Sequence, residues 1–156
     1  MGNWEARIAE LGLTIRDPLP PGGLYSSVVI DGLWAYTSGT VAVEGPPLKL
    51  AYVGRLGEDV SIEDGRKSAA AALISTLGNL RGALGTLDRI ERVVKMVGYV
   101  RATHDFDKSP AVMDGAAELI EQIFGKHLLP ARSAVGVSAL PGGASVELDT
   151  VIKLTS

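Results

Sequence analysis

The sequence predicts an α+β sandwich, in which one mainly antiparallel sheet carries two helices on one face. Two β-rich segments flank an Asp-Gly pair near the N-terminus, two helical patterns follow with one strand between them, and the last residues alternate between apolar and polar. The expected order is ββ(β)αβαββ, which is typical of an α+β protein. The length of 156 residues suits one domain covering residues 1–156.

The first segment, residues 1–19, is expected to be an extension that carries one short helix. A helix over residues 3–11 would place its Trp, Ile and Leu side chains on one side. Residues 18–23 are rich in Pro and Gly and interrupt regular structure.

A β-hairpin is expected next. Tyr25–Ile30 and Leu33–Ser38 are both rich in strand-forming residues, and only Asp31-Gly32 separates them. This dipeptide tolerates the positive φ angles of a tight turn and is therefore a strong hairpin signal. The loop Gly45-Pro46-Pro47 then precedes a weak strand over Leu50–Val53.

Two helices are expected to cover the sheet. Ser61 stands three residues before Asp64, which is similar to a capping box, and Gly85 ends the helix that they begin. Ser109-Pro110 begins the second helix, with Ser as N-cap and Pro in the first turn, and Gly125 ends it. Apolar residues recur at spacings of three and four and define the buried faces: Ala70, Leu73, Leu77, Leu80 and Leu84, then Met113, Ala116, Ala117, Ile120, Ile123 and Phe124.

Three further strands are expected, over Val93–Val100, Ser133–Ala139 and Ser145–Leu154. The segment Leu140–Ala144 joins the last two and contains Pro-Gly-Gly, which predicts a hairpin turn. Pairing about this turn would set Arg132 opposite Lys153 and Glu147 opposite Ser138. Arg132 and Glu147 would then lie about 20 Å apart, at about 3.3 Å per residue.

The same alternation predicts one apolar sheet face for the helices and one face of small and polar residues. Arg132, Glu147 and Asp149 are expected on the polar face. A sheet with this face bare would make a poor monomer, so neighbouring subunits are expected to cover it. If Arg132 and Glu147 share a cleft, the separation above implies that they come from different chains.

Composition excludes several classes of protein. The chain has 15 Lys and Arg against 18 Asp and Glu, a net charge of −3, which argues against a nucleic-acid partner. It has no cysteine and only His104 and His127, so neither a metal site nor a disulfide is expected. No signal peptide is recognisable and no apolar stretch approaches the about 18 residues of a membrane span. A cytoplasmic protein without a membrane partner is expected.

Six short motifs occur in the order found in one known family. Gly23-Leu24-Tyr25-Ser26-Ser27 and Tyr36-Thr37-Ser38-Gly39-Thr40 are similar to its G-P-Y-S-x-A and F-x-S-G-Q motifs. Its helical L-x-N, P-A-R-x-x-V, L-P and V-E-I motifs correspond to Leu77-Gly78-Asn79, Pro130-Ala131-Arg132, Leu140-Pro141 and Val146-Glu147-Leu148. Over residues 20–154 the chain resembles the Rid family, also called YjgF-like or L-PSP endoribonuclease-like.

This resemblance implies a chorismate-mutase-like fold assembled as a homotrimer, with clefts at the subunit interfaces. It also implies hydrolysis of reactive 2-imino acids and their enamine tautomers to 2-keto acids and ammonia, without a cofactor. Arg132 would clamp the substrate carboxylate, Glu147 would lie near the reacting carbon and water, and Tyr25, Ser38 and Gly39 would line the pocket.

The chemistry of these side chains is consistent with such roles. A guanidinium fork matches a carboxylate in bidentate geometry, which lysine cannot imitate. Imine hydrolysis needs an oriented water, a group that accepts its proton, and protonation of the departing nitrogen. One carboxylate within hydrogen-bond reach, here Glu147, can carry those protons.

The sequence departs from the family pattern in ways that indicate a divergent subgroup. Asp114 stands, within one residue, where many of the deaminases have an asparagine, and Ala134 occupies a pocket position that is cysteine in some members. Gly23-Leu24 replaces Gly-Pro, and Thr40 replaces Gln. Asp114 and Ala134 are therefore included among the expected binding residues.

Two other functions remain open. A non-catalytic trimer that binds a small carboxylate metabolite would use Arg132 in the same way, so only turnover separates it from the deaminase. Endoribonuclease activity is less favoured, because RNA cleavage needs an acid–base pair and cationic phosphate contacts. The chain is acidic, and no motif surrounds either histidine.

Overall fold

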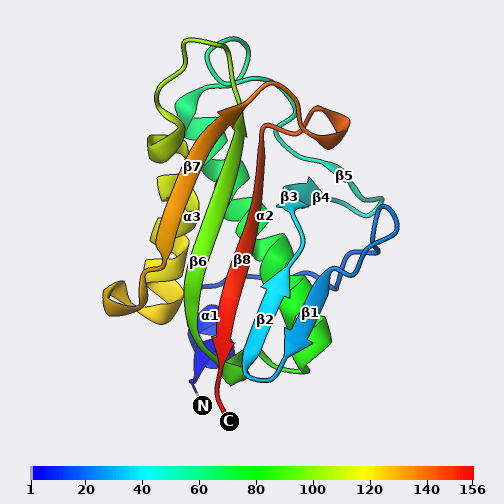
Figure 1. Cartoon of the computed structure of the whole chain (residues 1–156), viewed down its shortest axis with the longest axis vertical. Helices are drawn as coiled ribbons and strands as arrows, with labels where there is room; N and C mark the ends of the chain where they lie inside the picture. The colour runs from blue at the N-terminus through cyan, green and yellow to red at the C-terminus, as the bar shows by residue number, and fades with distance from the viewer. Residues whose placement is uncertain (1) are drawn as a thin grey trace.

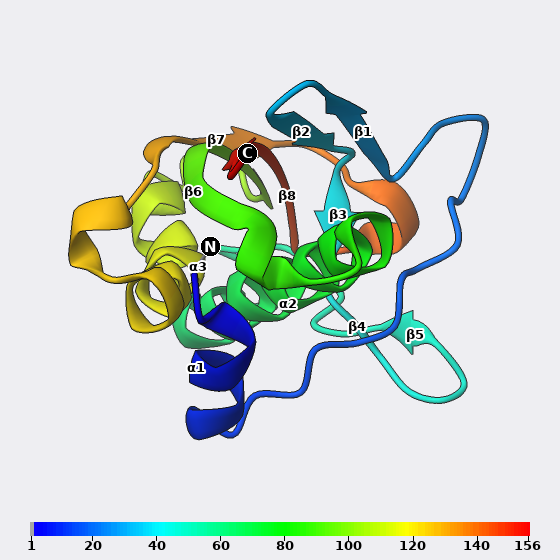
Figure 2. The same cartoon turned by 90° about the horizontal axis from the view of Figure 1, so that it is seen from below.

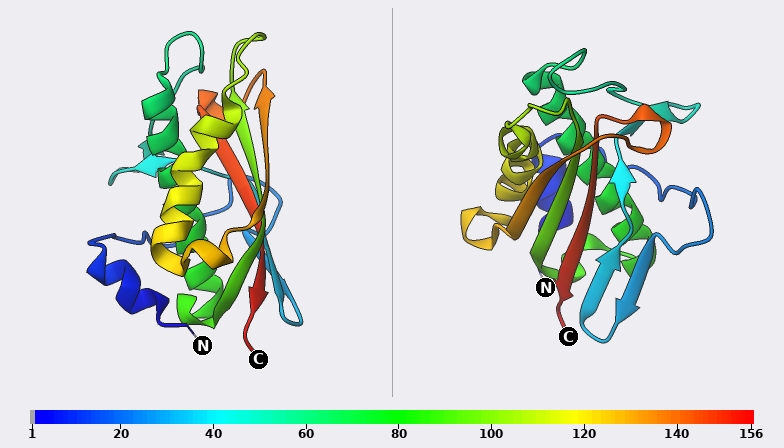
Figure 3. Two further views of the ribbon diagram at one scale, coloured as in Figure 1. Left: turned by 90° about the vertical axis from the view of Figure 1, so that its left-hand side faces the viewer. Right: turned by 45° about the horizontal axis from the view of Figure 1, so that its top comes forward.

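A computed structural model describes residues 2–156 and has two layers, a twisted sheet and helices packed on one of its faces (Figures 1 and 3). The helices are α1 (Trp4–Glu10), α2 (Ile62–Leu84) and α3 (Ser109–Phe124), and the strands are β1 (Val28–Asp31), β2 (Trp34–Thr37), β3 (Thr40–Val41), β4 (Val43–Glu44), β5 (Lys49–Leu50), β6 (Ile90–Arg101), β7 (Ala131–Val137) and β8 (Val146–Leu154).

The strands of the sheet follow the order β1-β2-β8-β6-β7, and β3 also pairs with β8. Neighbouring strands are antiparallel except for β6 and β7. The expected α+β class with a mainly antiparallel sheet is confirmed.

The helices form largely where the sequence predicts them. The Ser61 hydroxyl accepts a hydrogen bond from the Asp64 amide at the start of α2, and Gly85 ends that helix with φ +81°. The expected N-cap of α3 is wrong by one position, because Ser109 is already helical and Lys108 precedes it without a side-chain cap. Ser109 is buried in the first turn instead.

The hydrophobic core lies between the sheet and helices α2 and α3. Its fully buried side chains come from both layers and include Leu73, Leu77, Met96, Ile120 and Leu148. The short α1 adds to it through Ile8 and through an edge-to-face contact of Trp4 with Phe124, whose ring centres are 5.1 Å apart. Within residues 2–156, no helix combines the length and apolarity needed to cross a bilayer.

The predicted hairpin between the last two strands is wrong. β7 and β8 do not pair with each other, because the 12-residue β6 lies between them. β7 pairs with β6 in parallel, with Met96 beside Arg132, whereas β8 pairs with β6 in antiparallel, with Tyr99 beside Glu147. The turn at Leu140–Ala144 therefore carries the chain across the end of β6 rather than folding β8 back onto β7.

The predicted side-chain directions in β7 are also wrong. Arg132 pairs with buried Met96 and faces the helix layer, as do Ala134 and Gly136 after it. The valines of β7 face the open side of the sheet together with Glu147 and Asp149. The reason is the packing of β7 under α3, where Asp114 accepts a hydrogen bond from Arg132. A Cβ at Gly136 would lie 3.8 Å from the Ser109 hydroxyl of α3, which is an ordinary van der Waals distance.

A segment that we call the strap, residues 13–20, runs along α2 from α1 toward β1 (Figure 2). Gly78 and Gly82 of α2 admit it: a Cβ on Gly78 would lie 2.6 Å from the Arg16 carbonyl oxygen, and one on Gly82 would overlap the Pro18 ring. The Arg81 guanidinium donates to the Ile15 carbonyl at 2.8 Å. The strap is thus fixed against α2 by shape and by hydrogen bonds.

Candidate functional site

Four of the expected site residues meet in one pocket near the end of the sheet where β8 begins. Tyr25, Ser38, Gly39 and Glu147 line it together with Val41 and Pro141, and its volume is about 320 Å³. They come from the loop before β1, the turn between β2 and β3, and β8. The pairing of β2 and β3 with β8 brings these distant segments together.

Backbone hydrogen bonds fix the rim of this pocket. The Ser38 hydroxyl donates to the Ser26 carbonyl at 2.6 Å, and the Ser38 amide donates to the Ser27 carbonyl at 3.0 Å. The Tyr25 hydroxyl accepts a hydrogen bond from the Gly22 amide at 3.0 Å, which folds the ring over its own loop. The loop that carries Tyr25 is thereby held to the turn that carries Gly39.

Glu147 lies directly against Gly39. A Cβ at position 39 would overlap the Glu147 carboxylate, so only glycine leaves room for this side chain. Position 39 is therefore small because the carboxylate needs the space, which explains the Ser-Gly pair in physical terms.

The surroundings of Glu147 change the pKa of its carboxyl group. Burial, and then the negative charge of Asp149 two residues along the same strand face, raise the pKa of the Glu147 carboxyl. Tyr99 lies beside Glu147 on β6 and donates its hydroxyl to Asp149 at 2.8 Å, which raises the pKa of Tyr99. A half-buried carboxyl that binds a proton more tightly than usual is suited to exchange protons with a bound water or substrate.

Arg132 and Asp114 form a second group, on the other side of the sheet. The Arg132 guanidinium donates through Nη1 to Asp114 Oδ1 of α3 at 2.7 Å, and 23% of its side chain remains exposed. Within residues 2–156 this guanidinium makes no other hydrogen bond, so the rest of its fork is open to a ligand. Ala134 follows on the same face of β7 and packs against the edge of the core.

Within one chain, the Glu147 pocket and the Arg132–Asp114 pair lie apart from each other. Their partners on β6, Met96 and Tyr99, are three residues apart, so Arg132 and Glu147 point to opposite faces of the sheet. Two strand spacings and three residues along the strand separate their backbones by about 14 Å. The predicted separation of about 20 Å along a shared ladder is therefore wrong, since no such ladder exists.

Comparison with known proteins identifies the family. The model of the endoribonuclease L-PSP family matches residues 15–153. The chain belongs to this family. The L-PSP match leaves out α1 and begins within the strap, at residue 15.

Individual relatives agree with this L-PSP assignment over nearly the whole chain. Protein TCP17 of Trypanosoma cruzi is 32% identical over 99% of this chain and 96% of its own length. The structure of Atu1372 from Agrobacterium tumefaciens, a protein of unknown function, is 33% identical with a TM-score of 0.88, covering 97% of this chain and 92% of its own. RidA from a Psychrobacter species shares the fold at 23% identity and a TM-score of 0.64, covering 90% and 96%.

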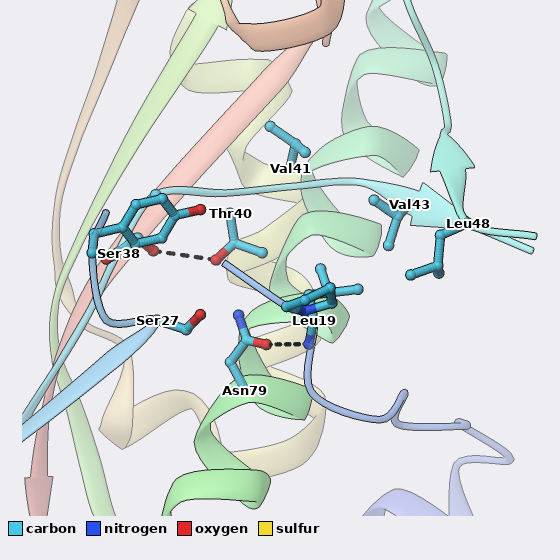
Figure 4. Close-up of a pocket in the computed structure, with 11 residues that line it drawn as sticks. Leu19, Ser27, Ser38, Thr40, Val41, Val43, Leu48 and Asn79 are labelled. Carbon is cyan, nitrogen blue, oxygen red and sulfur yellow. Dashed lines mark hydrogen bonds between the residues drawn. The ribbon is translucent and has the colours of Figure 1, made fainter. Parts of the chain in front are cut away.

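A second cavity adjoins the Glu147 pocket of this L-PSP protein, and the sequence did not indicate it. Its volume is about 240 Å³, and it shares Tyr25, Ser38, Gly39 and Val41 with the first (Figure 4). Its remaining lining comes from the strap, α2 and the β4–β5 hairpin, together with Ser27 before β1 and Thr40 of β3. The L-x-N motif pointed to Asn79, which lines this cavity, but the spacing of the motif does not show that the strap closes it.

Sequence reasoning also missed two neighbours of Glu147. Asp149 was expected on the same face, but its effect on the Glu147 carboxyl depends on burial, which spacing does not show. Tyr99 becomes visible only with the β6–β8 register. Within residues 2–156, no group of three His, Asp or Glu side chains is placed to hold a metal ion.

Proposed function

We propose that this protein hydrolyses 2-imino acids to 2-keto acids and ammonia, in a cleft formed by two copies of the chain. The observation that carries the proposal is the half-buried Glu147, seated against Gly39 in a preformed pocket and holding its proton more tightly than an ordinary glutamate. Membership of a family that includes RidA proteins supports it.

Glu147 would manage the protons of the reaction. Its carboxylate accepts a proton as water oxygen bonds to C2 of the imine, and the C=N π electron pair moves to nitrogen. The same carboxyl returns that proton to the nitrogen, which gives a neutral carbinolamine. The carbinolamine hydroxyl proton then passes through the carboxylate to the amino group as the C–N bond breaks; ammonia leaves with the C–N electron pair, and the hydroxyl oxygen becomes the carbonyl of the 2-keto acid, so one water is consumed for each ammonia released.

Arg132 would hold the substrate carboxylate from the neighbouring copy. Its fork keeps donors beyond the one that Asp114 occupies, and it faces away from Glu147 within its own chain. The open face of the sheet exposes large apolar side chains that a neighbouring copy would cover, namely Val29, Trp34, Tyr36 and Val135. A trimer with three such clefts fits this geometry, and light scattering that gives a mass of one 16.3 kDa chain would contradict it.

The decisive experiment supplies freshly generated imino acids from an amino-acid oxidase and measures keto-acid formation above the spontaneous rate. Wild type should accelerate it, whereas Arg132→Ala and Glu147→Gln should not. Mixed trimers of the two variants should recover activity, because some clefts then contain an intact Arg132 and an intact Glu147. An inactive mixture, despite demonstrated subunit exchange, would refute the shared cleft.

The same experiment decides between this function and its rivals. A protein that binds 2-keto acids through Arg132 yet never accelerates hydrolysis would be a metabolite-binding trimer. Cleavage of RNA is disfavoured at the Glu147 pocket, because Glu147 and Asp149 would repel a phosphodiester.

A further inference from the structure

The cavity that adjoins the Glu147 pocket has the composition of an apolar binding site. Its walls are aliphatic and come from three separate parts of the chain: Leu19 of the strap, Val41 and Val43 before the β4–β5 turn, and Leu48 within that turn (Figure 4). Small-molecule pockets typically combine such walls with a few fixed polar groups. At about 240 Å³ it has room for several carbon atoms, since one water takes about 30 Å³.

Several polar groups around this cavity are engaged, whereas the Ser27 hydroxyl and Asn79 Nδ2 make no hydrogen bond within residues 2–156. Asn79 is 6% exposed, and its Oδ1 accepts the Leu19 amide at 2.8 Å, which fixes the strap wall. The Thr40 hydroxyl donates to the Ser38 carbonyl at 3.2 Å. The hydrogen bonds of Asn79 and Thr40 hold the walls in place, and the rest of the lining is mainly aliphatic.

The apolar cavity adjoins the pocket in which the proposed reaction would take place. Gly39 and Ser38 line both cavities, and Glu147 lines only the first. A substrate whose C2 lies beside Glu147 would therefore extend its side chain past Gly39 into the apolar cavity.

We propose, building on the proposed function, that this cavity selects substrates with a branched aliphatic side chain of about four carbons over substrates with a single methyl group. An additional methylene in an apolar pocket improves selection by about tenfold or more. Wild type should bind 4-methyl-2-oxopentanoate at least about tenfold more tightly than pyruvate. Binding of these keto acids is measured by calorimetry on the full chain and does not require turnover.

Filling the cavity tests the assignment. Val43→Phe places a ring in the cavity from β4, away from Glu147, and should remove the preference for the larger acid while leaving pyruvate binding unchanged. Glu44→Phe is the matched control, because the next residue of the same strand points to the opposite side and is exposed. That control should keep the wild-type preference.

A second variant covers the case in which Val43→Phe does not fold. Leu48→Ala removes an exposed wall residue, so it should preserve the fold and weaken binding of 4-methyl-2-oxopentanoate alone. Equal binding of both acids by wild type, or equal effects of these variants on both acids, would overturn the inference. Selective binding without imine hydrolysis would sustain the inference and reject the deaminase, whereas hydrolysis without selectivity would do the reverse.

Discussion

Replacing Glu147 with glutamine should stabilise the protein at neutral pH. Burial first, and Asp149 second, raise the carboxyl pKa above 4.5. The folded state thus holds the proton more tightly than the unfolded chain, and stability falls as pH rises from the unfolded pKa through the raised folded pKa. The penalty is absent at lower pH and fully present above that window.

The contribution of Asp149, the second of the two causes, can be sized from the strand geometry. Residues 147 and 149 share a face of β8 at a spacing of roughly 7 Å. Two charges at that distance repel by about 0.6 kcal/mol in water and about 2.4 kcal/mol at an effective dielectric constant of 20. Because Glu147 is only half-buried, solvent screening keeps the gain near 1 kcal/mol or below. This corresponds to a rise in Tm of about 2–4 °C at most for a chain of this size.

Thermal unfolding at pH 7 and pH 4 measures this prediction. Glu147→Gln should melt higher than wild type at pH 7 and at nearly the same temperature at pH 4. Glu121→Gln on the exposed side of α3 is the control and should show no difference at either pH. A lower Tm for Glu147→Gln at pH 7, or the same shift at both pH values, would show that the carboxylate is not strained in this pocket.

Three further predictions concern the proposed cleft. Arg132→Lys should weaken calorimetric binding of 2-keto acids by about 1.5–3 kcal/mol, since lysine lacks the bidentate fork; unchanged binding would remove Arg132 from the site. Asp114→Asn keeps an oxygen for Arg132 but removes a negative charge roughly 5 Å from the bound carboxylate. It should tighten binding by about 0.8 kcal/mol, and weaker binding would contradict this role. Gly39→Ala forces Glu147 aside and should lower kcat/KM for imine hydrolysis by about 100-fold. Gly136→Ala adds a methyl that makes only an ordinary van der Waals contact with the Ser109 hydroxyl and should leave kcat/KM near wild type; equal activity of the two variants would refute the contact between Gly39 and Glu147.

The elements of this fold with strong local signals could be predicted from sequence. Capping by Ser61 and the stop at Gly85 are local effects, and both are found where expected. The hairpin is present, but its two-residue turn is Gly32-Leu33 rather than Asp31-Gly32, because Asp31 pairs with Trp34. The pairing of β7 could not be predicted in the same way. A short turn between two strands usually makes a hairpin, but whether a third strand inserts depends on where β6 finds its partners.

The candidate site could also be predicted from the sequence only in part. Tyr25, Ser38, Gly39 and Glu147 were expected together and do share a pocket. The direction of Arg132 was not predicted correctly, because the valines of β7 resemble core residues. Alternation shows that a strand has two different faces, but it does not tell a face covered by a helix from one left open for a second chain.

In this chain the groups proposed for the chemistry and one wall of the apolar cavity belong to different structural elements. The groups proposed for the chemistry belong to the sheet, whereas one wall of the apolar cavity belongs to a segment that precedes the first strand and is held by two glycines of α2. Changes at Leu19 or Leu48 can therefore reshape what enters the cavity without moving a carboxylate, a guanidinium or a sheet register. The proposed substrate range can therefore drift in evolution while the groups proposed for the reaction stay fixed.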